Sequence, residues 1–230
     1  MGGETESKYE LKRIRRVIGK PANQAVLEVG MGTGRIVRTL CNLGCRIVGL
    51  DINPRMIRHF NRKNRTNKVD LVIGDGQHLP FRRGVFDIVI CFRVMKYFHK
   101  PQDALAEIDL ALKSGGKLVV EFSNILAPTS LIIHLPQLLT LHKFYPRLYS
   151  LSQVRRWIGR LGLKTETVIP LQKIPGGVWN HARGRLAARL VLMTELAIER
   201  ITPAEFLSRN LLVLATKSDR QGNSWRQSAS

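Results

Sequence analysis

The stretch that decides the fold runs from residue 25 to residue 54 and reads AVLEVGMGTGRIVRTLCNLGCRIVGLDINP. It begins as a short apolar strand and passes through a glycine-rich turn. Apolar residues at helical spacing follow, and a second apolar strand leads into Asp51. A buried strand, a crossover helix and another buried strand make a parallel βαβ unit. Ligands of such sheets bind beyond the carboxyl ends of the strands, where the glycine turn and Asp51 both fall.

Two carboxylates distinguish this turn from a dinucleotide-binding turn. The dinucleotide pattern that starts at Gly30 needs a small residue at position 35, where this chain has Arg35. Asp51 suits the two hydroxyls of a ribose. Glu28, just before the turn, suits a ligand with a positive centre better than a pyrophosphate. A tight turn with a helix-packing glycine explains the glycines but neither carboxylate.

The pattern Glu28-x-Gly30-x-Gly32-x-Gly34 resembles the first motif of class I S-adenosylmethionine-dependent methyltransferases. The later strings GDGQHLPF…FDIVICFRV and LKSGGKLVVEF resemble the small-molecule methyltransferases related to ubiquinone and menaquinone biosynthesis enzymes, the methyltransferase type 11 group. The resemblance runs continuously over residues 25–123 and thins beyond them.

The resemblance implies a Rossmann-like, doubly wound α/β fold. Its sheet has seven strands and is mostly parallel with an antiparallel last strand, and helices cover both faces. The implied cofactor is S-adenosyl-L-methionine, and the implied activity is methyl transfer. The residues implied for cofactor binding are Glu28, Gly30, Gly32, Gly34, Asp51, Ile52, Asp75, Gly76 and Cys91. In the family, the positions of Asp75 and Gly76 hold the adenine, and that of Cys91 lines the methionine side.

We expect one methyltransferase domain over residues 25–217, with a basic helix before it in residues 1–24 and a disordered polar tail at 218–230. Helical cap insertions are expected near 124–149 and 174–205. In the family, the insertion after the fifth strand forms a lid over the acceptor substrate.

The net charge of +20 is the strongest signal of the composition. Such a charge attracts polyanions, either nucleic acid or an anionic lipid surface. The N-terminus lacks the pattern of a signal or transit peptide, and the weakly charged run at 125–141 is short and broken by prolines. We therefore expect a cytoplasmic protein, with peripheral contact to an anionic membrane or RNA left open, as is the oligomeric state. No histidine–cysteine set accompanies the cysteines, so no metal site is expected.

The sequence identifies the catalytic groups less clearly than it identifies the cofactor site. Arg93, Tyr97 and His99 follow the fourth strand and are the candidates for orienting the acceptor or accepting its proton. Enzymes that methylate exocyclic amines typically carry an Asn/Asp-Pro-Pro-aromatic motif at this place. Residues 91–94 read CFRV instead, which disfavours that chemistry.

The apolar segment after residue 123 has a basic rim, which suits a small-molecule or lipid-like acceptor such as a quinone precursor. One alternative is an RNA methyltransferase that binds phosphates on its basic surface. Against it, the aromatic residues of the cap cluster in one apolar segment and do not alternate with basic residues. Another alternative is a non-catalytic partner subunit that only binds the cofactor, which the intact carboxylates and glycines disfavour.

Overall fold

The computed structural model describes most of the chain. The described residues are 2–64, 68–128, 130, 147–172, 186–187, 189–191, 193–194, 197 and 208–218. Most of both predicted cap insertions and nearly all of the predicted polar tail lie outside these residues, so they stay predictions. Among the helices formed by the described residues, none has both the length and the apolarity of a membrane-spanning segment.

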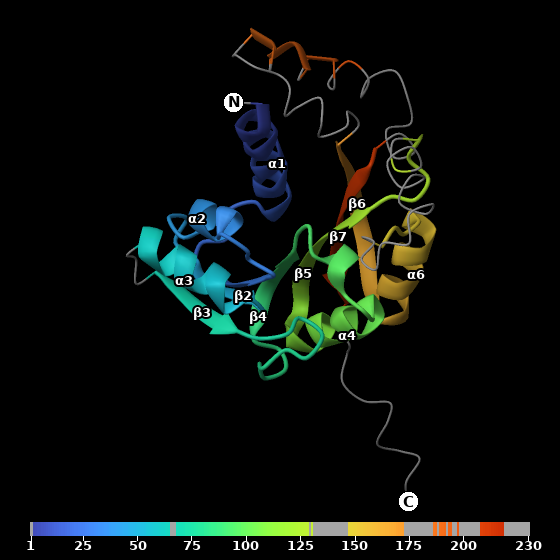
Figure 1. Cartoon of the computed structure of the whole chain (residues 1–230). Coiled ribbons are helices and arrows are strands. Elements are labelled where there is room, and N and C mark those ends of the chain that lie inside the picture. Colours follow the sequence, from blue (N-terminus) through green and yellow to red (C-terminus); the bar gives the residue numbers. More distant parts are fainter. Residues whose placement is uncertain are drawn as a thin grey trace, which may run out of the picture.

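A seven-stranded sheet in the order β3-β2-β1-β4-β5-β7-β6 forms the centre of the molecule (Figure 1). The strands are β1 (Ala25–Val29), β2 (Arg46–Asp51), β3 (Val69–Ile73), β4 (Phe86–Cys91), β5 (Leu112–Ser123), β6 (Leu163–Gln172) and β7 (Asn210–Lys217). Strands β1 to β5 are parallel, whereas β7 runs antiparallel to both of its neighbours, β5 and β6. The predicted mixed sheet with an antiparallel last strand is therefore confirmed.

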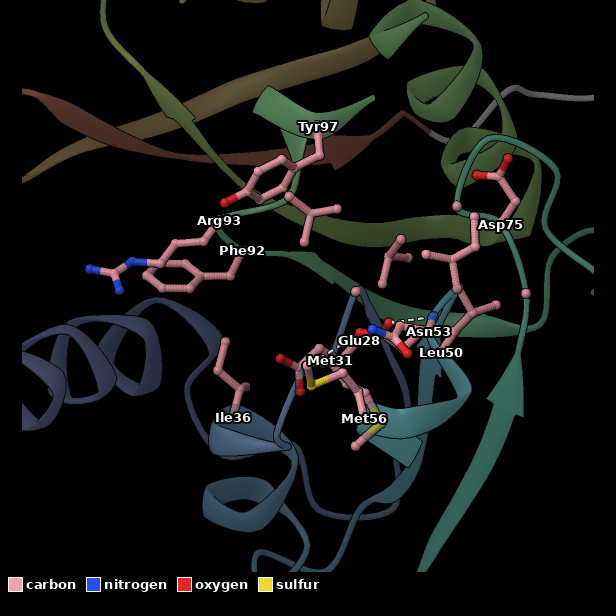
Figure 2. Close-up of a pocket in the computed structure, with 18 of the residues that line it drawn as sticks. Glu28, Met31, Ile36, Leu50, Asn53, Met56, Asp75, Phe92, Arg93 and Tyr97 are labelled. Carbon is pink, nitrogen blue, oxygen red and sulfur yellow. Dashed lines mark hydrogen bonds between the residues drawn. The ribbon is translucent and has the colours of Figure 1, made fainter. Parts of the chain in front are cut away.

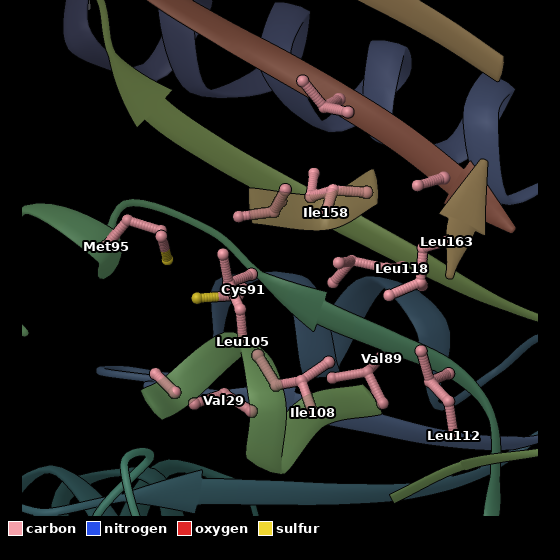
Figure 3. Packing of buried hydrophobic residues seen from close by; sticks show 14 of the residues in the cluster. Val29, Val89, Cys91, Met95, Leu105, Ile108, Leu112, Leu118, Ile158 and Leu163 are labelled. Atoms are coloured by element: carbon pink, nitrogen blue, oxygen red, sulfur yellow. The ribbon is translucent and has the colours of Figure 1, made fainter. Parts of the chain in front are cut away.

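Helices cover both faces of the sheet, as predicted. They are α1 (Gly2–Ile18), α2 (Arg35–Leu40), α3 (Pro54–Lys63), the short 3₁₀ helix η1 (Met95–Tyr97), α4 (Pro101–Ala111) and α6 (Leu151–Arg160). Successive side chains of a strand point to opposite faces, so Val26 joins the hydrophobic cluster under α1, α2 and α3, and Leu27 joins the cluster under α4 and α6. Figure 3 shows the second cluster, where Leu105 and Ile108 of α4 pack on Val89 of β4.

The N-terminal helix α1 is part of the core. Ile14 and Ile18 are almost completely buried and belong to the cluster that α2 and α3 also cover. Glu10, one turn earlier, is only 2% exposed, although its neighbours Lys8 and Lys12 are basic. One face of α1 therefore carries both apolar anchors and a buried carboxylate.

Candidate functional site

A cavity of about 780 Å³ opens at the carboxyl ends of the parallel strands (Figure 2). Its walls come mainly from four segments: the glycine turn after β1, residues Asp51 to Asn53 at the end of β2, residues Gly74 to Gln77 after β3, and residues Phe92 to Phe98 after β4. Because β1 to β4 are parallel, all four segments meet at the same edge of the sheet. The volume is in the range of cofactor and small-molecule sites.

The glycines of the turn after β1 have different surroundings. All three have positive φ angles, and a Cβ atom at Gly32 would have open space around it. At Gly30 a Cβ would lie 2.3 Å from Cγ2 of Val94, and at Gly34 it would lie 2.1 Å from Cδ2 of Phe60. Gly30 and Gly32 line the cavity, whereas Gly34 does not. Gly34 allows the start of α2 to pack closely against Phe60, and its contact with the cofactor stays a prediction.

Asp51 is fixed in place by the backbone. Its Oδ2 atom accepts a hydrogen bond from the N–H of Gly32 at 2.7 Å, and its Oδ1 atom accepts one from the N–H of Asn53 at 2.8 Å. Asn53 in turn caps α3, because its Oδ1 atom accepts from the N–H of Arg55 at 3.0 Å. Each carboxylate oxygen can accept more than one hydrogen bond. Asp51 can thus hold the turn and still receive a pair of ligand hydroxyls.

The segment after β3 forms one end of the cavity, and Arg93 lies at the other end (Figure 2). Asp75 accepts a hydrogen bond from the N–H of Gln77 at 2.9 Å through Oδ1. At Gly76 a Cβ would lie 2.7 Å from Cγ1 of Val29, so only glycine fits there. Ile52 belongs to the same cavity and is 67% exposed. A carboxylate next to an exposed apolar side chain suits a flat ring that carries an amino group.

Glu28 is buried at the bottom of the cavity and is only 3% exposed. Its Oε2 atom accepts a hydrogen bond from the N–H of Val37 in α2 at 2.9 Å. Burial away from water raises the pKa of Glu28 to about 8, although the Val37 hydrogen bond and the charge of Arg35 act in the opposite direction. In the absence of a ligand the carboxyl group is therefore mostly protonated at neutral pH. A positive group placed next to it would favour the ionised form.

Cys91, which the resemblance places on the methionine side, does not line the cavity. It is fully buried in the cluster under α4, with Met95 and Leu105 (Figure 3). The reason is the alternation of side chains along β4, which directs Cys91 to this face of the sheet. Burial also raises the pKa of its thiol. The wall of the cavity is formed instead by the residues that follow, Phe92 and Arg93.

Two of the three catalytic candidates lie at the cavity. Arg93 and Tyr97 line it, and Tyr97 is 55% exposed. His99 is exposed and lies outside the cavity wall, where its carbonyl oxygen accepts a hydrogen bond from Arg147 and its Nδ1 atom is 3.2 Å from Nη2 of Arg147. Of the three candidates, His99 is thus the one that does not line the cavity, and a catalytic role for any of them stays a prediction.

Two buried acids hold Arg93: Glu121, which follows from its place at the carboxyl end of β5, and Glu10, which sequence reasoning did not assign. Oε1 of Glu10 lies 2.8 Å from Nη2 of Arg93, and Oε2 of Glu10 lies 2.7 Å from Nη1 of Arg35. Oε2 of Glu121 on β5 accepts a hydrogen bond from the backbone N–H of Arg93 at 2.7 Å, and Arg93 has a φ of 62°. Burial raises the pKa of Glu121 to about 6. One signal in the sequence was available: Glu10 is the single acid between Lys8 and Lys20.

The strand order and the cavity at the edge of the sheet agree with the fold expected of a class I S-adenosylmethionine-dependent methyltransferase. Residues 27–120 match the family described as a methyltransferase domain. The chain is 35% identical over 111 residues to a demethylmenaquinone methyltransferase of Tropheryma whipplei, a match that covers 47% of this chain and 46% of that protein. The chain thus spans about half the length of the curated relatives it matches.

Solved structures share the fold over nearly the whole chain. A putative methyltransferase from Bacillus halodurans has a TM-score of 0.68 at 18% identity, covering 91% of this chain and 99% of that one. Phosphoethanolamine N-methyltransferase 2 from Haemonchus contortus, solved in complex with S-adenosyl-L-methionine, has a TM-score of 0.64 at 18% identity and covers 92% of this chain and 52% of that one. One of these neighbours therefore holds the cofactor that the sequence resemblance implies for this chain.

Proposed function

We propose that this protein transfers a methyl group from S-adenosyl-L-methionine to a small-molecule or lipid-like acceptor of the quinone-precursor kind. The observation that carries the proposal is the cavity itself, in which polar groups for a nucleoside meet an aromatic wall after β4 that contains Phe92, Tyr97 and Phe98. Ile125 and Leu126, which follow β5, add exposed apolar side chains, 42% and 53% exposed. The similarity to a demethylmenaquinone methyltransferase supports the same class of acceptor.

The residues of the cavity fit the parts of the cofactor in a definite order. Asp51 would accept hydrogen bonds from the ribose hydroxyls. Asp75 would accept one from the adenine amino group, while Ile52 covers the face of the ring. The open space over Gly32 leaves room for the amino-acid arm. Glu28, neutral before binding, would ionise next to the positive groups of the ligand.

The bound cofactor supplies an electrophilic methyl carbon on a sulfonium. The chain's own contribution is to align an acceptor with that carbon and to keep water away, since much of the rate of such a transfer can come from holding the reactants in near-attack geometry. Phe92 and Tyr97 provide apolar surface for an aromatic acceptor at this end of the cavity. The Tyr97 hydroxyl would orient an oxygen of that acceptor.

The test is a transfer assay with cofactor labelled on the methyl group. The purified protein is given demethylmenaquinone in its reduced form, because a hydroquinone ring carbon is electron-rich enough to attack a methyl cation equivalent. In parallel it is given the lipid, small-molecule and RNA fractions of a cell extract. Label in the lipid or small-molecule fraction, absent with Asp51→Ala, is the expected result. Binding of the cofactor without transfer to any fraction would favour a non-catalytic partner subunit.

The outer face of α3 favours a second candidate, an RNA methyltransferase. Its exposed basic side chains are Arg55, Arg58, Arg62 and Lys63. Such a face can bind phosphates, and its affinity for RNA would fall steeply with salt. Label found only in RNA in the assay above would overturn the acceptor class proposed here and support this candidate.

A further inference from the structure

Two arginines of the cavity converge on one carboxylate of the N-terminal helix. Glu10 is 2% exposed, and its two oxygens contact Arg35 at 2.7 Å and Arg93 at 2.8 Å. The side chains of these arginines are 25% and 39% exposed, and both line the cavity. Glu10 therefore holds both arginines, while part of each side chain remains accessible from the cavity.

The same two guanidinium groups also lie near one aromatic ring. Cζ of Arg35 is 5.2 Å from the ring centroid of Phe92, and Cζ of Arg93 is 5.9 Å from it. Arg93 is further fixed through its backbone, since its N–H donates to Glu121. Attraction between a guanidinium and a ring face adds to the ion pairs. The two arginines are thus held in position before any ligand arrives, which lowers the entropic cost of binding.

The place of the pair within the cavity suggests what it binds. Figure 2 shows Asp75 at one end of the cavity and Arg93 at the other, with Leu50 and Asn53 between them. If the adenine lies at Asp75 and the ribose at Asp51, the amino-acid arm must extend toward the arginine end. That arm ends in an ammonium and a carboxylate. Glu28 is available for the ammonium and the sulfonium. The carboxylate of the arm needs a positively charged partner of its own.

We propose that Arg35 and Arg93 form the subsite for the carboxylate of the cofactor's amino-acid arm, with Glu10 as the residue that positions both. This inference rests on the proposed function, because it assigns one part of the same ligand. Guanidinium groups bind carboxylates through paired, charge-assisted hydrogen bonds. The subsite also gives α1 a role in cofactor recognition that its position in the sequence does not suggest. The competing explanation is that Glu10 only fastens α1 to the domain.

The experiment compares S-adenosylmethionine with its decarboxylated analogue, which keeps the adenosyl group, the sulfonium and the amine. Dissociation constants are measured by calorimetry for the wild type, Arg35→Met, Arg93→Met and Glu10→Gln. We expect the wild type to prefer the intact cofactor by about tenfold or more, as for a charged hydrogen-bonded pair. Each methionine variant should lose most of this preference while its affinity for the decarboxylated analogue stays within about threefold of the wild type. Glu10→Gln should lose part of it.

A matched control is Arg58→Met, which removes the same charge from the exposed outer face of α3 and should keep the full preference. Equal loss of affinity for both ligands in the methionine variants would overturn the proposal, since the arginines would then act only on the structure of the cavity. Should these variants unfold, Arg35→Lys and Arg93→Lys retain the charge without the paired geometry, and their preference should still fall. Failure of the wild type to bind either ligand would instead refute the proposed function.

Discussion

The carboxylate of Asp51 accepts a hydrogen bond from the backbone N–H of Gly32 at 2.7 Å, which joins the end of β2 to the glycine turn after β1. The two segments are 19 residues apart in the chain. One side chain therefore holds the shape of the turn and faces the place where we put the ribose. Loss of this carboxylate should affect binding in two ways, by removing the partner of the hydroxyls and by releasing the turn.

We predict that Asp51→Ala weakens cofactor binding by about 100-fold or more, since hydrogen bonds to a charged group are each worth about 1.5–3 kcal/mol. Asp51→Asn should fall between this variant and the wild type, because its amide oxygen can still accept one of the two backbone hydrogen bonds. Calorimetry with S-adenosylhomocysteine measures both. Asp70→Ala, which removes an exposed carboxylate from β3 outside the cavity, is the control. Unchanged binding of the cofactor by Asp51→Ala would contradict the proposal that Asp51 binds the ribose hydroxyls.

Gly32 and Gly34 should respond differently to replacement by alanine. At Gly34 the added Cβ would lie 2.1 Å from Phe60, so Gly34→Ala should lower the free energy of unfolding by about 2–4 kcal/mol. At Gly32 the added Cβ has open space, so Gly32→Ala should cost only roughly 1 kcal/mol for its positive φ while it weakens cofactor binding. Urea denaturation and calorimetry on both variants separate the two effects. Equal stabilities would contradict this division of roles.

The sequence predicted the sheet because each strand is a short apolar run bounded by turn residues. The same logic located Asp51 and Asp75, since residues at the carboxyl end of a parallel strand must lie at the ligand-binding edge. Gly76 was assigned through the resemblance to the family. All three residues line the cavity.

The sequence is least informative where a shift of one residue decides which side chain reaches the cavity. Cys91 is the last residue of β4 and faces the core, whereas Phe92 and Arg93 reach the cavity. A strand boundary predicted from a sequence is uncertain by more than one residue. Glu10 could not be placed for a different reason. Its partners Arg35 and Arg93 are 25 and 83 residues away, and no local pattern encodes a contact that only the packing of α1 creates.

Glu28 should make the stability of the protein fall as the pH rises. Its folded pKa of about 8 is above the ordinary value of 4.5, so between these two values the unfolded chain releases a proton that the folded chain retains. The destabilisation begins above the unfolded pKa and is complete above the folded one. Glu28→Gln cannot ionise and keeps an oxygen for the N–H of Val37. Its melting temperature relative to the wild type should therefore rise steadily from about pH 5 to about pH 8. A constant difference would contradict the raised pKa.

The same residue predicts a proton released on cofactor binding. At pH 7 the buried Glu28 carboxyl is mostly protonated in the free protein, because desolvation raises its pKa to about 8. The sulfonium and ammonium of S-adenosylmethionine would favour the ionised form of Glu28. Binding should therefore release about one proton, and the affinity should rise with pH up to about 8. Calorimetry at pH 7 in buffers of different ionisation enthalpy measures the release. Because Glu28→Gln binds the same ligand, the difference between it and the wild type excludes protons exchanged by the ligand itself. Identical proton counts for the two proteins would show that Glu28 does not meet the positive groups of the cofactor.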